Sequence, residues 1–97
     1  MAGCISHEVK HELCKRMALN LATLRTKANL KQDELADRLG LSRPNISALE
    51  TGRHEMQWST FTTLAMFFAK DEEMKQIMIV MGLLTDEVEK ALNITVD

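Results

Sequence analysis

Two short helical patterns follow each other in this chain with only the tripeptide Gly-Leu-Ser between them, and this spacing constrains the fold most. The first pattern, KQDELADRLG (31–40), has acidic residues in its first turn and ends on Gly40. The second is opened by a capping Ser42, or by Arg43 one residue later, and runs to about residue 51. Two helices joined by so short a turn predict a helix-turn-helix unit.

Each position of this unit has a physical requirement. Ala36 must be small where the two helices cross, and Gly40 supplies the positive φ that turns the chain. Pro44 is acceptable because the first helical turn does not need its N–H. The remaining positions that define the unit are apolar. The residues that hold the pair on its domain are Leu35, Ala36, Leu39, Leu41, Ile46 and Leu49.

Helical periodicity continues on both sides of the unit, and no window alternates with period two for long, so we predict an all-α protein. A first helix from about residue 6 to 28 ends at Asn29, which tolerates positive φ. Its apolar stripe consists of Val9, Leu13, Met17, Leu21 and Leu24. Later helices are predicted to open at Ser59 or Thr60, at Asp71 and at Thr85.

The 97 residues are enough for one domain with one core, and 45% of them are hydrophobic. No repeat or linker divides the chain, so residues 1–97 are predicted to form a single domain. Its core spans residues 17–68, and a helical extension follows at residues 70–97.

The net charge of −2 hides an uneven distribution. Residues 1–55 carry nine Lys and Arg against seven Asp and Glu, whereas residues 56–97 carry three against seven. The chain therefore has a mildly basic part followed by an acidic part, and any phosphate contact must come from individually placed residues.

Several classes of function are excluded. There is no Ser/His/Asp set, phosphate loop or complete metal-ligand set, so we expect no enzyme, no cofactor and no metal. Cys4, His7, His11 and Cys14 are metal-ligand types, but on one helix they span about 15 Å, too far for a single Zn²⁺. The longest apolar run, IMIVMGLL (77–84), is too short to span a bilayer, and no signal peptide precedes Cys4, so we expect a cytoplasmic protein.

The segment LRTKANLKQDELADRLGLSRPNISALETG resembles the Cro/repressor (XRE-type) helix-turn-helix family, like the lambda-repressor DNA-binding domain. The resemblance covers about residues 17–68, and departs from the family at Lys31, where a capping Ser or Thr is usual, and at Met56, where Pro is usual. It implies a five-helix DNA-binding domain whose third helix enters the major groove of double-stranded DNA.

The outward face of the second helix of the unit is small and polar instead of the usual Glu and Lys, and the resemblance implies that this face reads DNA. The base-contacting positions are Arg43, Pro44, Asn45, Ser47 and Ala48. The phosphate-contacting positions are Gln32, Arg25, Ser42, Thr51, Arg53 and His54. The resemblance also implies an ion pair between Arg25 and Glu50 that ties the first helix to the end of the third.

The sequence thus predicts a sequence-specific DNA-binding transcriptional regulator that acts as a repressor and as a homodimer. The helix after Asp71 is apolar over much of its circumference, which predicts that a second subunit covers it. The dimerisation residues expected there are Met74, Ile77, Met78, Ile79, Val80 and Met81. The alternative is an antitoxin or antagonist whose acidic, Met-rich C-terminal part binds a protein partner, with DNA binding serving autoregulation.

Overall fold

The structure is a computed structural model that describes residues 5–92. It confirms the all-α prediction, because the described residues form six helices and no strand. The helices are α1 (His7–Lys27), α2 (Gln32–Leu39), α3 (Arg43–Thr51), α4 (Trp58–Ala69), α5 (Glu72–Val80) and α6 (Asp86–Leu92).

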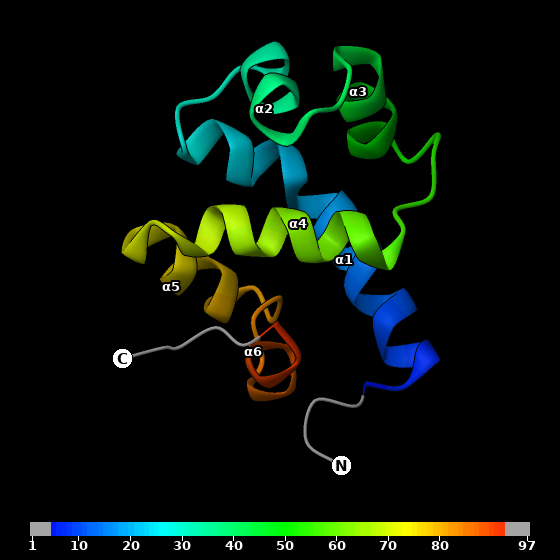
Figure 1. The fold of residues 1–97 in the computed structure, drawn as a ribbon, viewed down its shortest axis with the longest axis vertical. Coiled ribbons are helices and arrows are strands. Elements are labelled where there is room, and N and C mark those ends of the chain that lie inside the picture. The colour runs from blue at the N-terminus through cyan, green and yellow to red at the C-terminus, as the bar shows by residue number, and fades with distance from the viewer. Residues whose placement is uncertain (1–4, 93–97) are drawn as a thin grey trace.

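The helices are arranged with α2 and α3 together at one end of the molecule, α4 across the middle, and α5 and α6 at the other end (Figure 1). The long α1 runs behind α4 and contacts both α3 and α4. The described part measures 37 × 27 × 21 Å. Within residues 5–92, no helix combines the length and the apolar character that crossing a membrane requires.

Helix α1 begins where Ser6 caps it, since the Ser6 hydroxyl accepts a hydrogen bond from the N–H of Val9 at 3.2 Å. The prediction that Val9 belongs to the buried stripe is wrong, because its side chain is 42% exposed. The 3-4-3-4 spacing of the buried line, followed back from Leu24 through Leu21 and Met17, reaches Cys14 and then Lys10. At that position the Lys10 ammonium lies 5.4 Å from the centre of the Trp58 ring, and Val9 is turned away from the core.

The turns of the helix-turn-helix unit form as the sequence requires. Gly40, after α2, has a φ of 70°, and Gly52, after α3, has a φ of 78°. The hydroxyl of Ser42 accepts a hydrogen bond from the N–H of Asn45 at 3.2 Å, which makes Ser42 the cap of α3. The Lys31 side chain cannot cap α2, because an ammonium group has no hydrogen-bond acceptor. The backbone N–H of Lys31 instead donates to the Glu34 carboxylate at 2.8 Å.

The core lies between α1, α4 and the helix-turn-helix unit. Phe61, Leu64 and Ala65 of α4 are fully buried, and Met56, which replaces the proline usual in the family, is 5% exposed. Helix α4 begins at Trp58, slightly before the predicted Ser59, and the Trp58 ring stacks on Phe61 at 4.7 Å. Trp58 is partly buried and packs against the core.

The C-terminal extension is packed onto this core, and this removes Met74 and Met78 from the predicted dimer surface. Met74 and Met78 are 3% and 0% exposed, so they are covered by their own chain and no second subunit can cover them. Helix α5 is therefore amphipathic, with Val80 87% exposed on its outer face and Ile77, Ile79 and Met81 partly buried. The extension is held to α1 by Arg16, whose guanidinium donates to the carbonyl of Gly82 at 3.2 Å.

Candidate nucleic-acid interface

Helix α3 presents most of the predicted base-contacting residues on its outer face. Arg43 and Pro44, at its first turn, are exposed, and Asn45 and Ser47 are half-buried. Because the first turn of α3 contains no acidic residue, the Arg43 guanidinium has no carboxylate partner on its own turn. The N-terminal turn of α3 is thus the most accessible cationic part of the helix.

The prediction that Ala48 faces outward is wrong, since this residue is 3% exposed. The chain after α3 folds back over it: the N–H of His54 donates to the carbonyl of Ala48 at 3.2 Å. The Thr51 hydroxyl, which donates to the Ser47 carbonyl at 2.9 Å, lies on the same side. Because Ala48 is buried, its side chain is not available for contact with a base.

Helix α3 is fixed to the rest of the domain by a network centred on the Glu50 carboxylate. Arg25 of α1 donates from Nε to Glu50 Oε2 at 2.7 Å and from Nη2 to Glu50 Oε1 at 3.3 Å. The same guanidinium donates from Nη1 to the Leu30 carbonyl at 2.9 Å. This confirms the predicted Arg25–Glu50 pair, and its two side chains are only 17% and 7% exposed.

Gln32 is the third member of this network, a contact that the sequence did not reveal. Its amide nitrogen donates to Glu50 Oε1 at 2.9 Å. One carboxylate thereby joins the start of α2, the last part of α1 and the end of α3. Such a charge-assisted network holds α3 in a fixed orientation relative to the start of α2.

A concave, mostly cationic surface lies where α2 and α3 begin. It encloses about 460 Å³ and is lined by Arg25, Lys31, Gln32, Asp33 and Arg43. Three of these five side chains are cations, and the partial positive charge of the N-terminus of α2 lies at the same place. Lys31 was not among the predicted contacts, although its place directly before Gln32 at a helix N-terminus was a usable signal.

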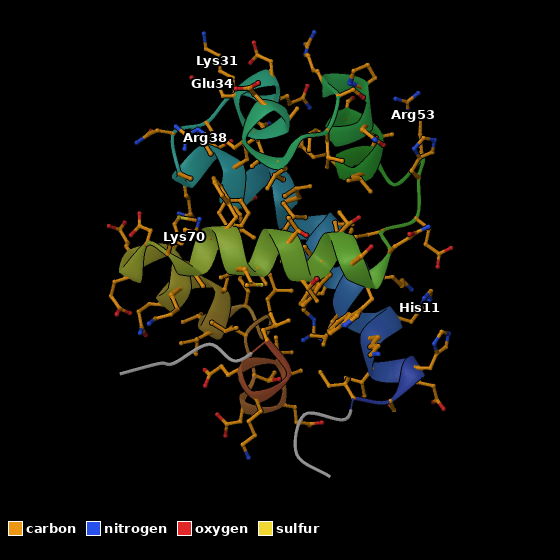
Figure 2. The ribbon with its side chains drawn as sticks, viewed as in Figure 1. His11, Lys31, Glu34, Arg38, Arg53 and Lys70 are labelled. Carbon is orange, nitrogen blue, oxygen red and sulfur yellow. The ribbon has the colours of Figure 1, made fainter. Side chains whose placement is uncertain are left out.

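The loop after α3 supplies a second group of exposed residues on the same end of the molecule. Arg53 donates from Nε to the Thr51 hydroxyl at 3.4 Å, and both side chains are exposed. Figure 2 shows Lys31 and Arg53 projecting from the end that carries α2 and α3, on either side of α3. The predicted phosphate-contacting residues Ser42, Thr51, Arg53 and His54 are all exposed.

No group of His, Cys, Asp or Glu residues within the described part of the chain could hold a metal ion. Cys4, the first residue of the candidate metal set, lies outside the described residues. His11 is instead paired with Glu55, at 3.3 Å between Nδ1 and Oε1. Cys14 is a buried free thiol whose pKa is raised by burial and, secondarily, by the negative charge of Glu55.

Residues 16–75 match the family model described as a helix-turn-helix domain. The match covers more than half of the chain and includes the whole turn unit, so the protein belongs to this helix-turn-helix family, of the Cro/repressor type. The family is one of DNA-binding domains. The comparisons with curated proteins and with solved structures gave no match.

Proposed function

We propose that this protein is a sequence-specific transcriptional regulator that reads the major groove of DNA with α3. The observation that carries the proposal is the arrangement of Arg43: it is exposed on the first turn of α3, while Glu50 at the other end of that helix is fixed by Arg25 and Gln32. A cation that contacts only phosphates carries no sequence information, whereas a cation held at a base edge can distinguish one base from another.

Arg43 is the residue that we propose to read a base. Its guanidinium can donate two parallel hydrogen bonds to O6 and N7 of guanine, which discriminates against the wrong base by about 1–3 kcal/mol. Pro44 offers an apolar surface that suits a thymine methyl group, and Asn45 and Ser47 can reach a base edge or a phosphate. Arg25 and Lys31, beside the start of α2, and Arg53, after α3, are placed to hold the DNA backbone on either side.

The protein is proposed to act as a homodimer on a near-palindromic operator. One reading helix covers only a few base pairs, and residues 1–55 carry only a small excess of positive charge. Two subunits related by a two-fold axis place their reading helices about 34 Å apart, one turn of DNA. Such a protein, working in the cytoplasm of a bacterial cell, represses by occupying a site that the transcription machinery needs.

The test begins with sequencing of DNA fragments selected by the purified protein, which yields the operator. Titration of that operator with the Arg43→Ala variant should then show a loss of about 1–3 kcal/mol and relaxed preference at one guanine in each half-site. Lys70→Ala is the matched control, because it removes a positive charge that lies far from α3 (Figure 2). An equal loss on unrelated DNA would show that Arg43 holds a phosphate and would remove the basis for reading by this residue.

One observation favours a second candidate, an antitoxin or antagonist that binds a protein partner. The extension from residue 70 to 92 carries six acidic residues against three lysines, and Val80 stands 87% exposed on it. A basic protein would fit this surface. The candidate predicts a wild-type protein that is monomeric alone and on DNA, whereas the leading proposal predicts a dimer on the operator.

A further inference from the structure

Leu19 is an unusual surface residue for the DNA-binding core. Its side chain lies on α1 and is 82% exposed, whereas the α1 residues Met17 and Leu21 on either side are fully buried. A single exposed leucine needs no explanation by itself. Its neighbourhood does, because Leu19 forms the rim of the groove that has the most apolar lining around the reading helix.

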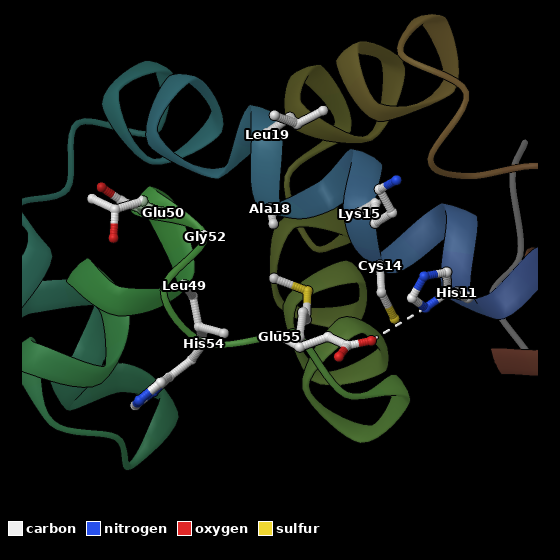
Figure 3. Close-up of a pocket in the computed structure, with 12 residues that line it drawn as sticks. His11, Cys14, Lys15, Ala18, Leu19, Leu49, Glu50, Gly52, His54 and Glu55 are labelled. Carbon is white, nitrogen blue, oxygen red and sulfur yellow. Dashed lines mark ion pairs between the residues drawn. The ribbon is translucent and has the colours of Figure 1, made fainter.

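This groove encloses about 480 Å³ and lies between α1 and the chain that leaves α3. Its apolar lining comes from Ala18 on α1, Leu49 at the end of α3 and Met56 before α4. Figure 3 shows Ala18 and Leu19 on the α1 side of the groove and Leu49 on the opposite side. The molecule therefore carries a protruding apolar side chain directly beside an apolar hollow.

Opposite charges lie on the two sides of the groove. Lys15 lies on the α1 side, and Glu55 lies on the side of the loop after α3 (Figure 3). Glu55 is 76% exposed and is paired with His11 at 3.3 Å, so its carboxylate keeps room for a second cation. The α1 wall thus offers a leucine and a lysine, the opposite wall offers a carboxylate, and the hollow lies between the two walls.

We propose that a second copy of this chain docks in this groove, with Leu19 of each subunit filling the hollow of the other. A two-fold contact brings each surface against itself, so that residue i meets residue j and j meets i. A protrusion beside a hollow, and a cation beside an anion, are complementary to their own two-fold image. Lys15 of one subunit then approaches Glu55 of the other. The inference rests on the proposed function, in which two subunits bind one operator.

The position of the groove suits this role. Its lining includes Glu50, Thr51 and Gly52, the residues that end the reading helix. A two-fold axis through this surface runs beside both reading helices, and the described domain is only 27 Å across its middle dimension. Subunits joined there can bring their reading helices within the roughly 34 Å of one DNA turn.

Three glutamate substitutions at exposed apolar residues separate the possible surfaces. Leu19→Glu tests the groove, Val80→Glu tests the outer face of α5, and Met66→Glu, at a 50% exposed position on α4, is the matched control. Sedimentation equilibrium of the free proteins and of their operator complexes gives the dimer dissociation constant. We expect Leu19→Glu to weaken dimerisation about a hundredfold, because the two-fold interface loses two leucine contacts and each contributes about tenfold. The Val80→Glu and Met66→Glu variants should change the dimer dissociation constant little. Circular dichroism should show that all three variants remain folded.

A charge exchange provides the second measurement. Lys15→Glu should weaken the dimer, and adding Glu55→Lys to that variant should restore it, because the two positions face each other across the two-fold axis. Mixing the two single variants, Lys15→Glu and Glu55→Lys, should also give a stable heterodimer, because each charge then meets an opposite charge on the other subunit. If Lys15 and Glu55 interacted only within one subunit, the mixed heterodimer would not be stabilised.

The outcomes distinguish this inference from the proposed function. A dimer that survives Leu19→Glu but dissociates on Val80→Glu overturns the groove as the interface and leaves the operator-binding dimer in place. A dimer that survives both substitutions overturns the groove equally. A wild-type protein that is monomeric at high concentration and on DNA overturns both the groove and the dimeric regulator, and favours the protein-partner alternative.

Discussion

The carboxylate of Glu50 is the most informative place to perturb the fold. Its side chain is 7% exposed and accepts hydrogen bonds from Arg25 at 2.7 and 3.3 Å and from Gln32 at 2.9 Å. The Glu50→Gln substitution keeps the shape but replaces one acceptor oxygen with an N–H₂ donor that faces other donors. At least one charge-assisted hydrogen bond is lost, and each contributes about 1.5–3 kcal/mol.

We therefore expect Glu50→Gln to lower the free energy of unfolding by about 2 kcal/mol. For a domain of this size, that corresponds to a fall in the melting temperature of roughly 8–16 °C. Calorimetry and urea denaturation followed by circular dichroism measure the two quantities independently. Because Glu50 joins α1, α2 and α3, the same variant should also bind the operator less tightly under conditions where it is fully folded.

The same substitution at Glu55 is the control. Glu55 is also paired across elements, with His11, but the two side chains are 76% and 55% exposed. Water screens such a pair, so Glu55→Gln should change the stability of the monomer, measured at a protein concentration too low for dimerisation, by less than about 0.5 kcal/mol. If the two variants lose the same stability, or if Glu50→Gln costs less than about 0.5 kcal/mol, then burial of the Glu50 network does not stabilise the fold and the reasoning fails.

Three further predictions follow from other parts of the molecule. Arg53→Ala should weaken binding to all DNA alike and lower the slope of log affinity against log salt by about one per subunit; an unchanged slope would show that this loop does not meet the backbone. Met78→Ala, at a fully buried position, should cost about 2–5 kcal/mol in urea denaturation, and a much smaller loss would mean that α5 is loosely packed. The pKa of Cys14 is raised by burial above its ordinary value of 9.0, so the unfolded thiol ionises first and stability should fall as the pH rises above 9.0; a Cys14→Ala variant in which the same fall persists would assign it to other groups.

The helix-turn-helix unit could be predicted almost completely from the sequence, because its signals are local. Gly40 and Gly52 adopt the positive φ values that end their helices, and Ser42 caps α3 through its own hydroxyl. These features depend on residues within one turn of each other and need no knowledge of the rest of the fold. The Arg25–Glu50 pair is a long-range contact, and only the resemblance to a family indicated it.

The wrong predictions concern burial, because burial depends on which other segment of the chain covers a residue. Periodicity assigned Val9 to the core and Ala48 to the surface, and the structure reverses both. Val9 lies at the edge of a stripe whose centre is set by the packing of α1 on α4. Ala48 would be exposed on an isolated helix, but the chain after α3 returns over it, and no pattern within α3 records that return.

The sequence by itself determined where the helices begin and end and that the chain is of the helix-turn-helix type, since caps, glycines and apolar periodicity act over a few neighbouring residues. Only the tertiary structure decided which apolar residues remain exposed to solvent. It buried Met78 under its own chain and left Leu19 and Val80 in solvent. The physical reason is that a side chain is buried by all the segments that pack around it. Segments far apart in the sequence come together around one side chain only after the chain has folded.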